Sequence, residues 1–196
     1  IGRTYAPRDD GLADEREWLA AVQFGRVGGE GWRAVRRPAD VHTATGLATA
    51  LVRAGGVREV GPEPNGAPYF HPVRQARLVT GGRAVAWAGE VHPLVLRAFD
   101  AAGPVAAVVL DLAAVLEAAP SEPPRYEDLL TVPVSTRDLA VVVDETARAA
   151  DLVAAARRAG APLVRDVRVF DRYAGEQVGE GRVSLALRLT LADPGR

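Results

Sequence analysis

Two histidine–proline pairs and a glutamate are the side chains best suited to acid–base or metal chemistry. His71 precedes Pro72, and His92 precedes Pro93 two residues after Glu90. Imidazole nitrogens and a carboxylate can bind zinc or transfer protons. A His-Pro pair is also typical of a turn at a strand end, because proline forces the residue before it into extended geometry. We favour turns, and a hydrolase that uses these three side chains remains an alternative.

Other catalytic motifs are absent from the sequence. The glycine-rich stretch at residues 25–31 lacks the Gly-Lys-Ser/Thr of a phosphate-binding loop, and all 24 basic residues are arginine. Ser121, Ser135 and Ser184 do not lie in a nucleophile elbow. The sequence therefore predicts no catalytic residues in this chain.

Asp171, Tyr173 and Ser184 are candidates for a different chemistry, the recognition of an unpaired base. They lie on two strands that we expect to be neighbours. An exposed tyrosine can stack on a base, and a carboxylate and a hydroxyl can bind its edge. Residues 125–196 hold eleven arginines and eleven acidic residues, a neutral balance that by itself favours an ordinary solvated surface. RNA recognition by a sheet is therefore a hypothesis at this point.

The elements that must position these three side chains form a β-α-β-β order. Apolar alternation and helical spacing predict strands at 139–143, 163–173 and 183–191 and a helix at 147–159. One further helix and strand would complete a ferredoxin-like βαββαβ unit. We therefore expect an incomplete ferredoxin-like region in which the first strand presents an open edge.

The first part of the chain predicts a mixed α+β region with antiparallel strands. Gly81-Gly82 lies between two apolar runs and is typical of a hairpin turn. The expected strands are at 17–24, 76–80, 83–87 and 105–110. The expected helices are one that could begin at Pro38, with helical spacing over 41–52, and one at 111–118.

The positions of three prolines predict how the chain divides into domains. Three prolines at positions 120, 123 and 124 predict a linker at residues 119–125 between a first domain, residues 1–118, and a second, residues 126–196. The 196 residues include no cysteine, no apolar run of membrane-spanning length and no signal-peptide pattern, so we expect a cytoplasmic protein without a membrane partner. The first residue is Ile1, and we expect both ends to be cut from a longer chain.

Five segments, in order, resemble one known family. They are YFHPVRQA (69–76), GEVHP (89–93), VPVSTRDLAVVVDE (132–145), VFDRYAG (169–175) and GRVSLALRLT (181–190). The first two resemble the catalytic-like domain of the bacterial phenylalanyl-tRNA synthetase β subunit, a class II synthetase-like fold. The last three resemble its ferredoxin-fold anticodon-binding domain.

The resemblance implies a function for each part. The whole enzyme joins phenylalanine to its tRNA with ATP and magnesium, as an α2β2 heterotetramer in which the α subunit performs the chemistry. The first region would be non-catalytic and pack on the α subunit, with no cofactor in this segment. The second would bind the tRNA(Phe) anticodon through Asp171, Tyr173 and Ser184, with Arg137 contacting the RNA backbone. A stand-alone α+β protein-interaction module without RNA binding remains the other interpretation.

Overall fold

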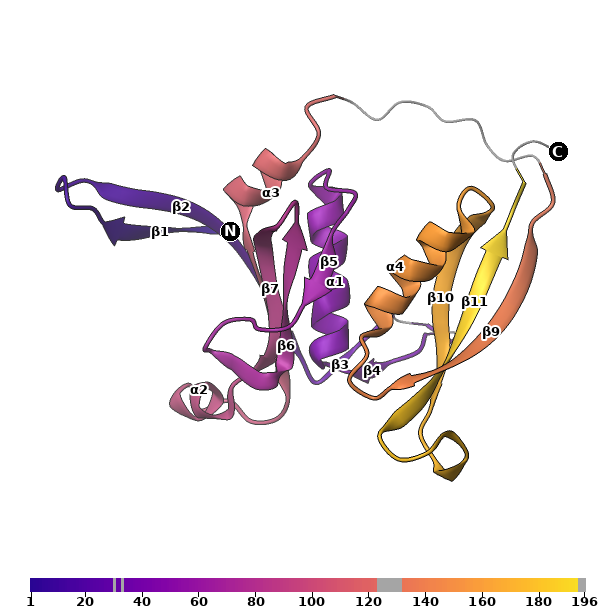
Figure 1. Ribbon diagram of the computed structural model, residues 1–196. Helices are drawn as coiled ribbons and strands as arrows, with labels where there is room; N and C mark the ends of the chain where they lie inside the picture. Colours follow the sequence, from indigo (N-terminus) through magenta and orange to yellow (C-terminus); the bar gives the residue numbers. More distant parts are fainter. Residues whose placement is uncertain (30, 33, 123–131, 194–196) are drawn as a thin grey trace. The chain divides into compact units, whose positions relative to one another are not determined.

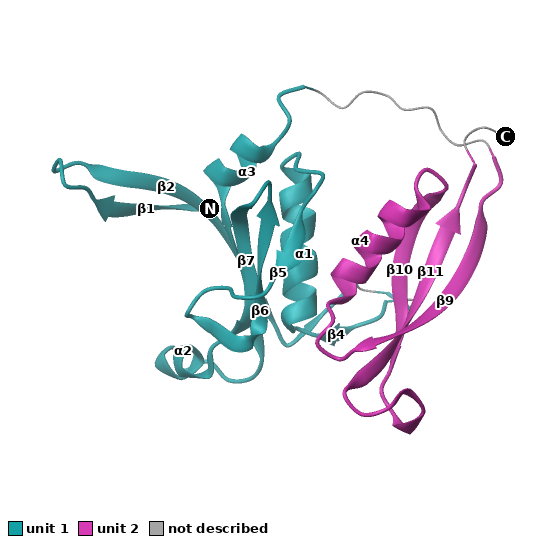
Figure 2. Cartoon of the chain, viewed as in Figure 1, with its two compact units in different colours: residues 1–123 teal, residues 124–196 magenta. Residues whose placement is uncertain are grey.

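The chain divides into two compact units (Figure 2). The computed structural model describes residues 1–29, 31–32, 34–122 and 132–193. Unit 1 comprises Ile1–Pro123 and unit 2 comprises Pro124–Arg196, so the division falls within the expected linker at 119–125, part of which lies outside the described residues. Within the described part of the chain, no helix has both the length and the apolar character of a membrane span.

Unit 1 is built on a six-stranded antiparallel sheet with the order β1-β2-β8-β7-β6-β5 (Figure 1). Its strands are β1 (Gly2–Pro7), β2 (Ala13–Phe24), β5 (Gly61–Glu63), β6 (Phe70–Thr80), β7 (Arg83–Val91) and β8 (Val105–Asp111). The short β3 (Arg26–Val27) and β4 (Arg37–Pro38) form a separate pair. Its helices are α1 (Val41–Ala54), α2 (Pro93–Ala98) and α3 (Leu112–Ala118).

Helix α1 forms the core of unit 1 with the sheet. Its start is fixed by a capping box, in which the Asp40 carboxylate accepts from the Thr43 N–H at 2.8 Å and the Thr43 hydroxyl accepts from the Asp40 N–H at 2.9 Å. Ala44, Ala48 and Val52 recur at helical spacing and are fully buried. Strands β6, β7 and β8 contribute the facing core residues Leu78, Val85, Val108 and Leu110. The helix predicted over residues 41–52 is therefore confirmed, but its expected start at Pro38 is wrong, because Pro38 belongs to β4 and Asp40 is the cap.

The β6–β7 hairpin is also confirmed. Gly81 and Gly82 have φ values of +55° and +80°, a region that glycine occupies without steric cost. Strand β1, the pair β3–β4, strand β5 and helix α2 were not expected from the sequence. These elements are too short for a periodic pattern to be visible.

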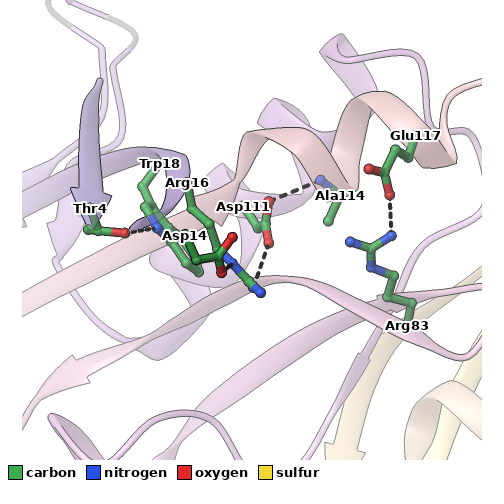
Figure 3. A network of polar contacts seen from close by, with 8 residues as sticks. All are labelled: Thr4, Asp14, Arg16, Trp18, Arg83, Asp111, Ala114 and Glu117. Carbon is green, nitrogen blue, oxygen red and sulfur yellow. Dashed lines mark hydrogen bonds and ion pairs between the residues drawn. The ribbon is translucent and has the colours of Figure 1, made fainter. Parts of the chain in front are cut away.

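A polar network joins β2, β7 and α3 in unit 1 (Figure 3). Asp111 is only 6% exposed and caps α3, since its carboxylate accepts from the Ala114 N–H at 3.0 Å. The Arg16 guanidinium lies 3.9 Å from the same carboxylate. Arg83 of β7 forms an ion pair with Glu117 near the end of α3. The helix is thus tied to the sheet at both of its ends.

Unit 2 has the predicted β-α-β-β order. Its elements are β9 (Ser135–Asp144), α4 (Ala149–Gly160), β10 (Val164–Tyr173), the single-turn 3₁₀ helix η1 (Glu176–Val178) and β11 (Arg182–Leu191). The strands form an antiparallel sheet in the order β10-β11-β9, and α4 lies along one face (Figure 1). The antiparallel sheets and few helices of both units confirm the α+β class.

Strand β9 lies at one edge of this sheet. Among the described residues it pairs with β11 alone, and most of its side chains are exposed. Leu139, opposite the buried Leu187, is itself 50% exposed. Helix α4 therefore covers the β10–β11 side of the sheet more completely than the β9 side.

Candidate nucleic-acid interface

The side chains of β11 alternate between the two faces of the unit 2 sheet. Leu185 and Leu187 are 4% and 1% exposed and belong to the face that α4 covers. Ser184, Ala186 and Arg188 alternate with them, and successive side chains of a strand point to opposite sides of a sheet. Within the described residues no helix covers this second side. We call it the open face.

Strand β10 carries a β-bulge at Phe170. Val169 pairs with Leu187, but Asp171, two residues further on, pairs with Ala186, which is only one residue away on β11. A bulge inserts one extra residue and so reverses the alternation of the strand beyond it. Asp171 therefore lies on the open face, although uninterrupted alternation would place it on the same side as Val169.

Tyr173 lies directly opposite Ser184 on the open face. The ring is 44% exposed, and its hydroxyl end lies over Gly175. A Cβ atom at residue 175 would come within 2.4 Å of the tyrosine hydroxyl oxygen, although Gly175 has an extended backbone with φ of −176°. A side chain at residue 175 would thus displace the tyrosine ring, although the backbone conformation would accept it. The aromatic ring and the serine hydroxyl form one surface.

Asp171 is the third predicted residue on this face. Its Oδ1 atom accepts a hydrogen bond from the Arg172 backbone N–H at 2.9 Å, which holds the carboxylate beside the strand. The structure therefore brings together Asp171, Tyr173 and Ser184 as a carboxylate, an aromatic ring and a hydroxyl. This set can stack on a base and bind donors on its edge.

A second cluster lies on the open face beside these three residues. Arg188 forms a two-pronged ion pair with Asp138 of β9, with Nε–Oδ1 and Nη2–Oδ2 distances of 2.8 and 2.7 Å. The Arg188 guanidinium also lies 4.9 Å from the centre of the Phe170 ring. The hydrogen bonds from Arg188 lower the pKa of the Asp138 carboxyl below its ordinary value.

The fourth predicted residue, Arg137, does not join this cluster. It pairs with Leu189 of β11, on the side of the sheet opposite to Arg188. Its guanidinium donates to the backbone oxygen of Thr136 at 2.8 Å. Alternation along β9 thus separates Arg137 from Asp171, Tyr173 and Ser184, the other predicted contacts.

His92 lies between β7 and α2, whereas His71 lies inside β6. The Nδ1 atom of His92 accepts from the Leu94 N–H at 3.1 Å at the start of α2, and the Nδ1 atom of His71 accepts from the Val73 N–H at 3.2 Å. Glu90 forms an ion pair with Arg74 at 2.8 Å. Among the described residues, no group of three His, Cys, Asp or Glu side chains is placed to hold a metal ion. The turn at a strand end is therefore confirmed for His92 and wrong for His71, which is the second residue of β6. The local partners of His71, His92 and Glu90 do not favour the hydrolase.

Comparison with known families matches both units. The model of the phenylalanyl tRNA synthetase beta chain CLM domain matches residues 1–112, more than half of the chain. The chain belongs to the phenylalanyl-tRNA synthetase β-chain family. The model of the ferredoxin-fold anticodon binding domain matches residues 131–196, which contain the open face. The predicted resemblance is confirmed for both regions.

Curated relatives of this synthetase family match along nearly the whole chain. The phenylalanine–tRNA ligase beta subunit of Symbiobacterium thermophilum is 38% identical over 96% of the chain and 21% of its own length. Those of Geobacillus kaustophilus and Bifidobacterium longum are 34% and 32% identical over 100% and 97% of the chain. The chain spans about a fifth to a quarter of the length of these relatives.

Sequence reasoning missed four residues of the open face or its support: Asp138, Phe170, Gly175 and Arg188. Phe170 and Gly175 stand inside the segment VFDRYAG, whose resemblance indicates only Asp171 and Tyr173 as base contacts. Asp138 and Arg188 lie 50 positions apart, and only the β9–β11 register brings them together. The alternation along residues 183–191 could have indicated Arg188, because it places Arg188 on the same side of the strand as Ser184.

Proposed function

We propose that the open face of unit 2 binds the anticodon of tRNA(Phe). Tyr173 stacks on an unpaired base, and Asp171 and Ser184 bind its edge. The observation that carries this proposal is the direct pairing of Tyr173 with Ser184 on an uncovered sheet face, inside the segment that matches an anticodon-binding family. A stacked base that is also held by its edge gains both affinity and base selectivity.

The three side chains would make different contributions to base binding. The Asp171 carboxylate only accepts hydrogen bonds and therefore selects a base edge that carries N–H donors. The Ser184 hydroxyl can donate or accept and tolerates either edge. The Tyr173 ring contributes stacking that depends little on which base is present. Selectivity should therefore depend mainly on Asp171, and affinity mainly on Tyr173.

We place Arg137 outside this base-binding surface. Its position across the sheet, toward Leu189, leaves it available for an RNA phosphate only if the RNA reaches around the β9 edge. Arginine suits phosphate because its planar guanidinium presents several donors. Its contribution is thus to affinity for the RNA backbone and not to base selectivity.

The relatives are phenylalanine–tRNA ligase beta subunits, and we extend the proposal to the whole protein on that basis. This chain is a non-catalytic segment of the β subunit of a cytoplasmic phenylalanine–tRNA ligase, which uses ATP and Mg²⁺ for aminoacylation. Unit 1 packs on the α subunit of an α2β2 heterotetramer. In support, Val22 and Phe24 of β2 are 69% and 64% exposed, and an exposed apolar sheet surface is suited to packing on a protein partner.

Binding of a fluorescent tRNA(Phe) anticodon stem-loop to the 196-residue chain tests the anticodon proposal. The expected result is saturable binding that weakens when the anticodon bases are replaced while the stem is kept. If the stem-loop does not bind while the folded chain binds a protein partner tightly, the protein-interaction module is the better account.

A further inference from the structure

We propose that Phe170 and Arg188, held by Asp138, form a second base-stacking platform on the open face. The face would then bind two bases of a single-stranded loop, one at Tyr173 and one at Phe170. This inference rests on the proposed RNA-binding function and deepens it. Its ligand is an unstacked nucleotide next to the one that Tyr173 holds.

Arg188 presents a flat surface because its orientation is fixed from two directions. The paired hydrogen bonds to Asp138 hold the guanidinium in the plane of the carboxylate. The Phe170 ring lies 4.9 Å from the guanidinium carbon and supports it from a second side. The side chains of Arg188 and Asp138 still remain 52% and 47% exposed. A planar guanidinium of this kind is a known type of surface for base stacking.

Phe170 lies on the open face because it follows Val169 of the covered face, and its ring lies beside Arg188. It is the extra residue between Val169, which lies on the covered face, and Asp171, which lies on the open face. The ring contacts Arg188 and is 52% exposed. An aromatic ring exposed to this extent on a sheet face, beside a predicted stacking residue, is suited to receive a base.

The spacing of the two rings favours separate bases. Phe170 and Tyr173 lie three residues apart on β10, which corresponds to about 7–10 Å along the strand because the bulge shortens it. Neighbouring stacked bases are only about 3.4 Å apart. The two rings therefore cannot hold two bases of one continuous stack. They fit bases splayed apart, as in a single-stranded loop.

The charge balance argues against a phosphate site at Arg188. Asp138 neutralises the guanidinium and occupies two of its donors. An RNA phosphate would have to displace this carboxylate or share its donors. Loss of an arginine that contacts phosphate reduces the salt dependence of binding, with a slope of about 0.7 per contact on single strands. Loss of a stacking arginine leaves that slope unchanged.

Anisotropy titrations of a fluorescein-labelled tRNA(Phe) anticodon stem-loop against the whole chain test the platform. We expect Phe170→Ala and Phe170→Leu to weaken binding about 5- to 150-fold, the range for loss of one stacked base. Phe170→Trp should retain binding. Leu139→Ala is the matched control, because Leu139 is 50% exposed on the opposite side of the same sheet. Circular dichroism of each variant verifies folding.

Single abasic substitutions in the RNA loop then assign each ring to its base. We expect two loop positions at which base removal weakens binding to the wild-type chain. Phe170→Ala should abolish the effect at one position, and Tyr173→Ala at the other. Arg188→Gln should reproduce the Phe170→Ala pattern without a change in the salt slope.

The outcomes separate this inference from the proposed function. If Tyr173→Ala weakens binding but Phe170→Ala and Phe170→Leu do not, the anticodon proposal stands and the second platform is wrong. If Arg188→Lys binds normally while Arg188→Gln lowers the salt slope, Arg188 is a phosphate ligand and the stacking role is wrong. If the stem-loop does not bind to the wild-type chain, both proposals fail together.

Discussion

Tyr173 of β10 lies directly opposite Ser184 of β11, and the bulge at Phe170 produces this pairing. Before the bulge, Val167 and Val169 point toward the face that α4 covers. Without the extra residue, Asp171 and Tyr173 would continue on that covered side. A local irregularity in one strand thus moves two polar side chains to the side of the sheet that no described helix covers.

Replacing Tyr173 with alanine tests the stacking role. We expect weaker binding of the anticodon stem-loop by about 1–3 kcal/mol, since a base loses its aromatic partner. Tyr173→Phe should retain most of the affinity because stacking needs only the ring. Tyr5→Ala in unit 1 is the control, because Tyr5 is also exposed but belongs to a different unit. Equal affinities of Tyr173→Ala and the wild type would contradict the assignment.

Gly175→Ala tests how the ring is positioned. The new methyl group would lie 2.4 Å from the Tyr173 hydroxyl oxygen, so the ring must move. Because Gly175 has an extended backbone, we expect no loss of folding stability from conformational strain. RNA affinity should fall, and the double variant with Tyr173→Ala should bind no more weakly than Tyr173→Ala alone. Additive losses in the double variant would show that the two residues act independently.

Titration of the Asp138 carboxyl tests the ion pair with Arg188. The hydrogen bonds from Arg188 lower the pKa of Asp138 below 3.8. A depressed carboxyl pKa means that the pair stabilises the fold above pH 3.8, and that this contribution disappears as the pH falls through the lower, folded-state pKa. Carboxyl-carbon NMR should report the lowered value, and Arg188→Gln should raise it. A pKa that is the same in both proteins would mean that the pair does not form in solution.

Asp111→Ala tests the polar network of unit 1. The substitution removes the N-cap of α3, and we expect the free energy of unfolding to fall by about 1–2 kcal/mol. Asp111→Asn keeps a capping oxygen and should lose less. Urea unfolding monitored by tryptophan fluorescence suits this measurement, because Trp18 and Trp87 lie in the same unit. Identical losses in both variants would exclude capping as the main contribution.

Regular elements could be predicted because each leaves a repeating pattern. The alternation of Leu185, Leu187 and Leu189 is sufficient to predict β11, and the spacing of Ala44, Ala48 and Val52 is sufficient for α1. In each case the repeat identifies a buried face. Short strands such as β5 contain too few residues for any repeat to be visible.

The site could be predicted in part. Residue chemistry and family resemblance together indicated Asp171, Tyr173 and Ser184, and the structure places all three on one face. A bulge has no local sequence signature, so the positions of Asp171 and Tyr173 on the open face could not be derived from alternation. Pairing between distant strands was also needed to see that Asp138 holds Arg188 and that Arg137 points to the other side.

The most direct test of the anticodon proposal compares two RNAs against the 196-residue chain. One is the tRNA(Phe) anticodon stem-loop, and the other has the same stem and loop length with all three anticodon bases removed as abasic nucleotides. We predict at least about a 5-fold lower affinity for the abasic loop, the minimum loss for one stacked base. Equal affinities for the two RNAs at several salt concentrations would show that the chain senses only phosphate charge, and would contradict base recognition by the open face.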